Sequence, residues 1–232
     1  MNLIKNPKTN HDPVTHGMSF SEVQVPGEYS VRCPSVDICG TILLGKIGGL
    51  DAWCAPPHLR RIEMRNCWFS AWPEWMNPSH LRYLSILSVV VKELQQEDLQ
   101  ILGRFPALRD LYLLVDHEER GILRRLIVGA ASFPSLVQCK LRNFTPPVVF
   151  WQGAMPRLTD LDLTFPVRKT REIAGSITDF ELGLGNLSSP QNVLNRFRSE
   201  DDSEEDTEEA MAVLWRAAIV HPNHPTLRDW RK

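Results

Sequence analysis

The chain of 232 residues lacks several features that would assign it to a common class. It has no run approaching the roughly 18 apolar residues that a membrane-spanning helix needs. Its start, MNLIKNPKTNHDP, has no apolar segment of the kind found in secretory signals. Its five cysteines are scattered without a C-x-x-C pair, which favours a reduced protein over a disulfide scaffold. We therefore expect a cytoplasmic protein.

The chain also has little excess charge of either sign. With 26 basic and 28 acidic residues the net charge is −2, so no overall field attracts nucleic acid or anionic lipid. The acidic residues are nevertheless concentrated in EDDSEEDTEE, residues 200–209. A free acidic tail would repel itself and stay disordered. We favour a helix with an acidic first turn, because the helix dipole stabilises carboxylates there and an apolar stripe follows at Ala210, Val213, Leu214 and Ala217.

Catalytic and metal-binding motifs are missing as well. The segment GTILLGKI, residues 40–47, resembles a phosphate-binding loop, but Ile47 replaces the Ser or Thr that would hold magnesium. Its bulky centre, Ile42 to Leu44, predicts a core strand instead. His221 and His224 are too few for a metal site, which needs three or four ligands, and we expect His221 to end a helix. The sequence thus predicts no enzyme, no cofactor and no metal.

A repeat is present in place of these features. The pattern L-x-x-L-x-L recurs five times, with first positions separated by 22, 27, 28 and 22 residues, which is the period of leucine-rich repeats. In four copies a proline stands two residues ahead and directs the chain from the return segment into an extended strand. The five predicted sets of buried positions are Leu59, Ile62 and Met64; Leu81, Leu84 and Ile86; Leu108, Leu111 and Leu113; Leu136, Cys139 and Leu141; and Leu158, Leu161 and Leu163.

This spacing predicts an α/β fold, an irregular leucine-rich repeat solenoid with a curved parallel sheet on its concave side. An ordinary α/β domain with a similar strand rhythm is the alternative. The convex side is expected to mix helices and loops, since residues 92–103 and 120–131 have helix-like apolar spacing. We expect Trp68, Trp72 and Trp75 to fill space between coils. The predicted organisation is an extension or cap over 1–50, repeats over 51–198, and an acidic segment with a capping helix over 199–232.

The strand residues between the buried leucines should face outward on the concave side, the usual binding surface of a solenoid. They mix charges of both signs with tyrosine and leucine, whereas nucleic acid would require a positive stripe. A protein partner fits better, with Tyr and Arg side chains as the strongest anchors. The predicted partner-binding residues are Arg61, Glu63, Tyr83, Asp110, Tyr112, Lys140, Arg142, Asp160 and Asp162; Ser85 and Leu87 are predicted to share this face.

Several stretches resemble a known family. LRRIEMRNCWFSAWPEWM, ELQQEDLQILGRFPALRDLYL, GAMPRLTDLDLTFPVRKTREI and AAIVHPNHPTLR are similar to the carboxy-terminal leucine-rich repeats of grass nucleotide-binding disease resistance proteins. The resemblance covers roughly residues 50 to 230. It implies a plant immune role, in which the repeats sense a pathogen effector or a guarded host protein, or restrain the receptor's switch domains.

A second hypothesis is a leucine-rich-repeat substrate adaptor of a ubiquitin ligase. That function needs an F-box-like helical segment ahead of the repeats. Prolines at positions 7, 13, 26 and 34 interrupt residues 1–50, so we favour the immune module.

Overall fold

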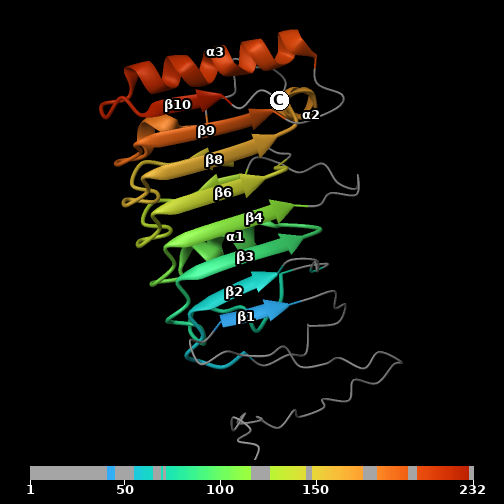
Figure 1. Ribbon diagram of the computed structural model, residues 1–232, viewed down its shortest axis with the longest axis vertical. Helices are drawn as coiled ribbons and strands as arrows, with labels where there is room; N and C mark the ends of the chain where they lie inside the picture. The colour runs from blue at the N-terminus through green and yellow to red at the C-terminus, as the bar shows by residue number, and fades with distance from the viewer. Residues whose placement is uncertain are drawn as a thin grey trace, which may run out of the picture. The chain divides into compact units, whose positions relative to one another are not determined.

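In the computed structural model the chain divides into two units, residues 1–33 and 34–232. The structure describes residues 41–44, 55–64, 69, 72–115, 126–144, 148–174, 182–197 and 203–229. All of these residues belong to the second unit (Figure 1).

A single sheet of eight parallel strands forms one side of this unit. Successive coils each add one strand, so the strands stack in sequence order and point the same way (Figure 1). This arrangement confirms the predicted α/β leucine-rich repeat solenoid. The strands are β1 (Thr41–Leu44), β2 (Arg61–Met64), β3 (Ile86–Val91), β4 (Asp110–Val115), β6 (Gln138–Arg142), β8 (Asp160–Phe165), β9 (Asn192–Phe197) and β10 (Thr226–Asp229).

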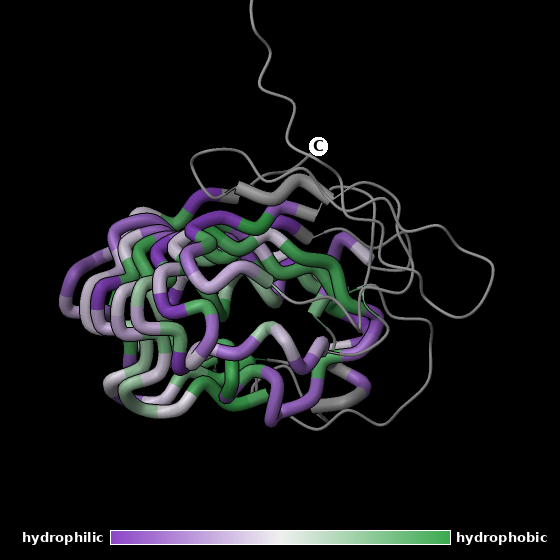
Figure 2. The backbone as a smooth tube through the Cα atoms, turned by 90° about the horizontal axis from the view of Figure 1, so that it is seen from below, coloured by the Kyte–Doolittle hydropathy of each residue, from purple (hydrophilic) through white to green (hydrophobic). Residues whose placement is uncertain are grey.

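The core is built from side chains that occupy the same register position in every coil. In a strand, alternate residues point to opposite faces, and the inward ones stack along the solenoid. One such row is at most 6% exposed throughout; its members are Ile62, Leu87, Leu111, Cys139, Leu161, Val193 and Leu227. Seen along the stack, successive coils superimpose around one shared interior (Figure 2). Each coil thus buries its apolar face against its neighbours.

The second copy of the repeat has a different register from the predicted one. Leu84, Leu87 and Val89 are the buried set, all 0% exposed, and Ile86 points outward opposite Asp110. The expectation that Leu81, Leu84 and Ile86 form this copy is therefore wrong, although Leu81 is also buried. The shift of three residues evens the spacing of first positions, which become Leu59, Leu84 and Leu108.

Backbone hydrogen bonds lock each coil to the next just before the strands begin. The carbonyl of Arg60 accepts the N–H groups of both Ser85 and Ile86, and the pattern repeats from coil to coil. The carbonyls of Ser85, Arg109, Val137 and Thr159 each accept two N–H groups in the same way, and the Gln191 carbonyl accepts the N–H of Thr226. Because these groups are paired, the sheet begins in one fixed register in every coil.

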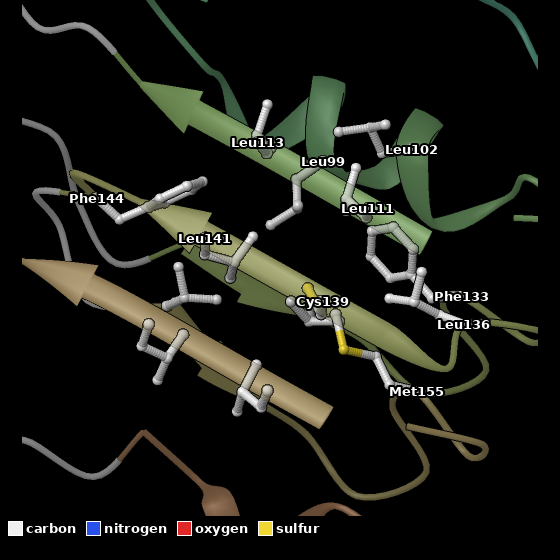
Figure 3. Close-up of a cluster of buried hydrophobic side chains, with 14 of the residues drawn as sticks. Leu99, Leu102, Leu111, Leu113, Phe133, Leu136, Cys139, Leu141, Phe144 and Met155 are labelled. Atoms are coloured by element: carbon white, nitrogen blue, oxygen red, sulfur yellow. The ribbon is translucent and has the colours of Figure 1, made fainter. Parts of the chain in front are cut away.

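The return side was predicted to mix helices and loops; where it is described, it also contains short strands, and helix α2 (Val167–Ala174) follows β8. The return side carries α1 (Gln96–Gly103), β5 (Leu126–Val128), β7 (Val148–Phe150) and the 3₁₀ turn η2 (Leu184–Asn186). The Gln96 side chain of α1 is hydrogen-bonded to the backbone of β5. Its amide donates to the Ile127 carbonyl and accepts the Ile127 N–H, each at 2.8 Å. Side chains of α1 and of the sheet meet in the core between them (Figure 3).

Helices were expected in two return segments, and the structure has a helix in one of them. Residues 92–103 do contain a helix, α1. The helix expected over 120–131 is wrong for its described part, where Leu126–Val128 is a strand followed by a turn; residues 120–125 lie outside the described part. The β5 strand pairs in parallel with β7, and this pairing of coils overrides the local helical spacing.

The aromatic return segment behaves as expected where it is described. Trp75 is buried and packs edge-on against Phe69, with ring centroids 6.0 Å apart. The Trp72 indole donates to the Met76 carbonyl at 3.1 Å. These two rings fill space between coils, and Trp68 lies outside the described residues.

The carboxy-terminal segment contains the predicted helix. Helix α3 (Glu204–Val220) begins after Ser203, whose side chain accepts the Asp206 N–H, and its first turn holds Glu204, Glu205 and Asp206. It buries Ala210, Met211, Leu214 and Ala218 and lies along the end of the sheet beside β10 (Figure 1). The helix with an acidic first turn is thereby confirmed.

Strands β1 and β10 extend the sheet beyond the predicted repeat region. The β1 strand falls within residues 1–50 and pairs with β2, as expected of a core strand over residues 42–44. The β10 strand follows α3 and pairs with β9. Gly45, Lys46 and Ile47 lie outside the described residues, and the boundaries at 50 and 198 stay predictions.

Candidate protein-recognition face

The outward side chains of β2, β3, β4, β6, β8, β9 and β10 form a surface, which we call the sheet face. Strand pairing arranges them in three rows that run across the coils. The first row holds Arg61, Ile86, Asp110, Gln138, Asp160, Asn192 and Thr226; the second holds Glu63, Ser88, Tyr112, Lys140, Asp162, Leu194 and Arg228; the third holds Val90, Leu114, Arg142, Thr164 and Arg196.

The structure brings eight of the nine predicted partner-binding residues onto this face. They are Arg61, Glu63, Asp110, Tyr112, Lys140, Arg142, Asp160 and Asp162. Tyr83 is the exception, because the shifted register places it in the turn before β3, where it is 53% exposed. Leu87, also expected to face outward, is fully buried. That these residues bind a partner stays a prediction.

Asp162 is the centre of an ion-pair network on the sheet face. Arg142, one strand away, donates to its Oδ2 and to the hydroxyl of Thr164. Arg196, on the opposite neighbouring strand, has its guanidinium 3.8 Å from the same Oδ2. The network therefore links β6, β8 and β9 through one carboxylate.

Asp162 is buried despite its outward position, with 7% of its surface exposed. Its second oxygen, Oδ1, has no hydrogen-bond partner among the described residues. Burial raises the pKa of the Asp162 carboxyl above its ordinary value, although Arg142, Arg196 and Lys140 act in the opposite direction. A buried ion pair of this kind is weak evidence for stability, because desolvation offsets the Coulomb attraction.

Other charged side chains on the face are paired locally. Arg61 forms an ion pair with Glu63 on the same strand. The Asp160 carboxylate accepts from Asn192 at 2.9 Å and from the Thr159 hydroxyl at 2.6 Å. Lys140 and Arg228 are exposed.

The repeat pattern did not predict the outward residues of β3, β9 and β10. A signal for β3 was present in the run ILSVVV, which is rich in β-branched residues and follows Leu84. In β9 the inward leucine position is taken by Asn195, which is buried and donates to the Met211 sulfur at 3.7 Å. The hydrophobic pattern therefore fails at β9, and Leu194, Arg196 and Arg228 escaped detection.

His221 has a structural role at the end of α3, as predicted. It is the C-cap residue and is buried, with Nε2 2.9 Å from the Leu187 carbonyl. Its Nδ1 accepts the Asn223 N–H at 3.0 Å. Within the described ranges, the structure groups no three His, Cys, Asp or Glu side chains as metal ligands would be, and no described helix is long and apolar enough to cross a membrane.

Comparison with known proteins agrees with this architecture. The family model described as "Leucine-rich repeat region" matches residues 34–227. The chain therefore belongs to this leucine-rich repeat family.

The chain is also similar to a plant disease resistance protein. The chain is 28% identical over 170 residues to the disease resistance protein RGA5 of rice, Oryza sativa subsp. japonica. The match covers 72% of this chain and 14% of the relative's length. This similarity confirms the predicted resemblance to the repeats of a plant disease resistance protein.

Proposed function

We propose that this chain is a non-enzymatic protein-recognition module of plant immunity, located in the cytoplasm, that binds its partner through the sheet face. Membership of the leucine-rich repeat family and similarity to a disease resistance protein support this function. The observation that carries it is the sheet face itself. It joins polar and charged side chains to Tyr112, Ile86 and Leu114 on a rigid scaffold.

The partner is a protein: a pathogen effector, a guarded host protein, or other domains of a receptor. Tyrosine and arginine dominate the energetics of protein interfaces, and the face offers Tyr112 beside Lys140, with Arg142 two residues further along the same strand. Its Asp110, Asp160 and Asp162 carboxylates disfavour nucleic acid, whose phosphates require an unbroken positive surface.

The test uses a pair of substitutions on neighbouring strands. The protein and its Tyr112→Ala, Lys140→Ala variant are used as baits in extracts of grass tissue, and captured proteins are quantified by mass spectrometry. Proteins retained by the unmodified chain and lost with the variant are expected. The matched control is Arg104→Ala, Trp151→Ala, which removes an exposed cation and an exposed ring from the return side. Equal losses with the control, or none with the variant, would contradict the proposal.

A further inference from the structure

Charge is distributed unevenly over the sheet face. Apart from Ser88 and Asp110, the strands β3 and β4 present apolar or aromatic side chains, those of Ile86, Val90, Leu114 and Tyr112. From β6 to β10 the face presents four cations, Lys140, Arg142, Arg196 and Arg228, against the two carboxylates of Asp160 and Asp162. The part from β6 to β10, which we call the cationic end, therefore has a net charge of +2.

Both carboxylates of the cationic end are already engaged within the protein. Asp160 accepts from Thr159 and Asn192, and Asp162 is held between Arg142 and Arg196. Asp162 thus fixes two guanidinium groups from strands on either side of it. Lys140 and Arg228 flank this network and are exposed. The cations at the edge, and not the carboxylates, are available to a ligand.

The second row of the face sets the spacing of these cations. Lys140, Asp162, Leu194 and Arg228 occupy one register position on four successive strands. Neighbouring strands are about 4.8 Å apart, so Lys140 and Arg228 are separated by roughly 14 Å. An extended peptide advances about 3.3 Å per residue, so this span corresponds to about four residues. Leu194, half-buried, lies between them.

We propose that the cationic end binds an extended acidic peptide of the protein partner, laid across the strands. Two carboxylates four residues apart pair with Lys140 and Arg228, and an apolar side chain between them packs on Leu194. This inference rests on the proposed function, because it names the chemistry of the partner that the sheet face would bind.

The test measures fluorescence anisotropy of the labelled peptide GESLSEG with the full chain. Its two glutamates are four residues apart and enclose a leucine. The peptides GQSLSQG and GKSLSKG, which have the same length and leucine, are expected to bind more weakly, by roughly two- to thirtyfold for GQSLSQG and more for GKSLSKG, since both lose two charge pairs and the second adds repulsion. Binding of GESLSEG should also weaken with added salt, which screens exposed charges.

Charge-reversal variants locate the binding site. Lys140→Glu with Arg228→Glu should weaken GESLSEG binding at least about tenfold. Arg104→Glu with Arg216→Glu makes the same change of charge at exposed positions on α1's C-cap and on α3, and it should leave binding unchanged. Circular dichroism of both variants checks that they fold.

The outcomes separate this inference from the proposed function. Lack of saturable GESLSEG binding, or equal affinity for GQSLSQG, would overturn the acidic ligand. So would equal weakening by both charge-reversal pairs. If partner capture still depends on Tyr112 and Lys140 in that case, the sheet face remains the recognition surface and only the ligand chemistry is wrong. If capture is also insensitive to those residues, both fail.

Discussion

Leu87 and Leu114 are the same residue type on neighbouring strands, yet their environments are opposite. Leu87 is fully buried and pairs in register with Leu111. Leu114 pairs with Val90 on the sheet face and is half-buried. Alternate residues of a strand point to opposite faces. A shift of one residue in register therefore decides which leucine is buried in the core and contributes to the free energy of unfolding.

Replacing Leu87 with alanine is expected to lower the free energy of unfolding by about 2–5 kcal/mol, because it leaves a cavity in the core. Leu114→Ala, the matched control, should cost about 1 kcal/mol or less, since much of this side chain stays in contact with water. Urea unfolding of both variants measures the difference. Equal costs would show that the register of β3 is wrong.

Asp162 gives a pH-dependent prediction. Because burial raises the pKa of its carboxyl, the folded protein holds this proton more tightly than the unfolded chain does. The site therefore contributes stability that is fully present below the ordinary pKa of 3.8 and is lost as the pH rises through the folded value. The uncharged isostere Asp162→Asn should accordingly be more stable than the unmodified protein at neutral pH.

That advantage should shrink as the pH falls toward 3.8, where the native carboxyl is also neutral. Thermal or urea unfolding across this pH range measures it. A variant less stable than the unmodified protein at neutral pH would show that the arginine pairing outweighs the burial of the carboxylate.

At the scale of elements, the side chain of Gln96 connects α1 to the neighbouring strand β5 on the return side. Gln96 of α1 acts as a short extension of β5, since its amide satisfies both the N–H and the carbonyl of Ile127. Gln100 is one turn later in the same helix and is exposed. Gln96 and Gln100 have the same side chain and lie on the same helix, but we expect only Gln96 to contribute to stability through the hydrogen bonds to Ile127.

Gln96→Ala should lower the free energy of unfolding by about 1–3 kcal/mol, because it leaves two backbone groups of Ile127 without partners. Gln100→Ala should change it by less than about 0.5 kcal/mol. Chemical denaturation quantifies both. If the two variants behaved alike, the amide ladder would contribute nothing to stability.

Helix α3 and strand β10 close the carboxy-terminal end of the sheet. Truncation after Arg198 removes both and leaves β9 with an open edge, which promotes aggregation. We expect that product to aggregate or unfold. Substituting Gln for the exposed Glu204, Glu205, Glu208 and Glu209 should instead leave a folded protein, because these side chains cover no core. Size-exclusion chromatography distinguishes the cases, and a monomeric, equally stable truncation would contradict the capping role.

At the scale of the whole repeat unit, one core runs through all the coils. Cys139 lies in the middle of the sheet order and is 0% exposed. Burial raises the pKa of its thiol well above the usual range, and the nearby Asp162 adds to this shift. The thiolate that reacts with electrophiles is therefore scarce in the folded state.

Cys139 should resist iodoacetamide in native buffer and react in denaturant, and peptide mapping by mass spectrometry follows it specifically. Its rate of modification should report the opening of neighbouring coils, because no reagent reaches it otherwise. Rapid native modification would mean that the coils around β6 open independently of the rest.

The sequence was sufficient for the architecture because burial repeats with a fixed period. The first, third, fourth and fifth copies of L-x-x-L-x-L were placed correctly from Leu59, Leu108, Leu136 and Leu158, each with a proline two residues ahead. The side chain of Met64, the last position of the first copy, lies outside the described part. The copy without that proline was misplaced by three residues. The outward face followed from alternation alone, so eight of nine expected residues are on it and Tyr83 is not.

By itself, the sequence determined the repeat, its parallel strands and the helix at 204–220, since these depend on local periodicity, capping and helix-dipole charge. Only the tertiary structure decided three things: the register of β3, the strand at 126–128, and the placing of Arg142, Asp162 and Arg196 on adjacent strands. Those depend on neighbouring coils 20 or more residues away in sequence. Contacts between neighbouring coils determine these three features, and the secondary-structure propensity of a single segment does not.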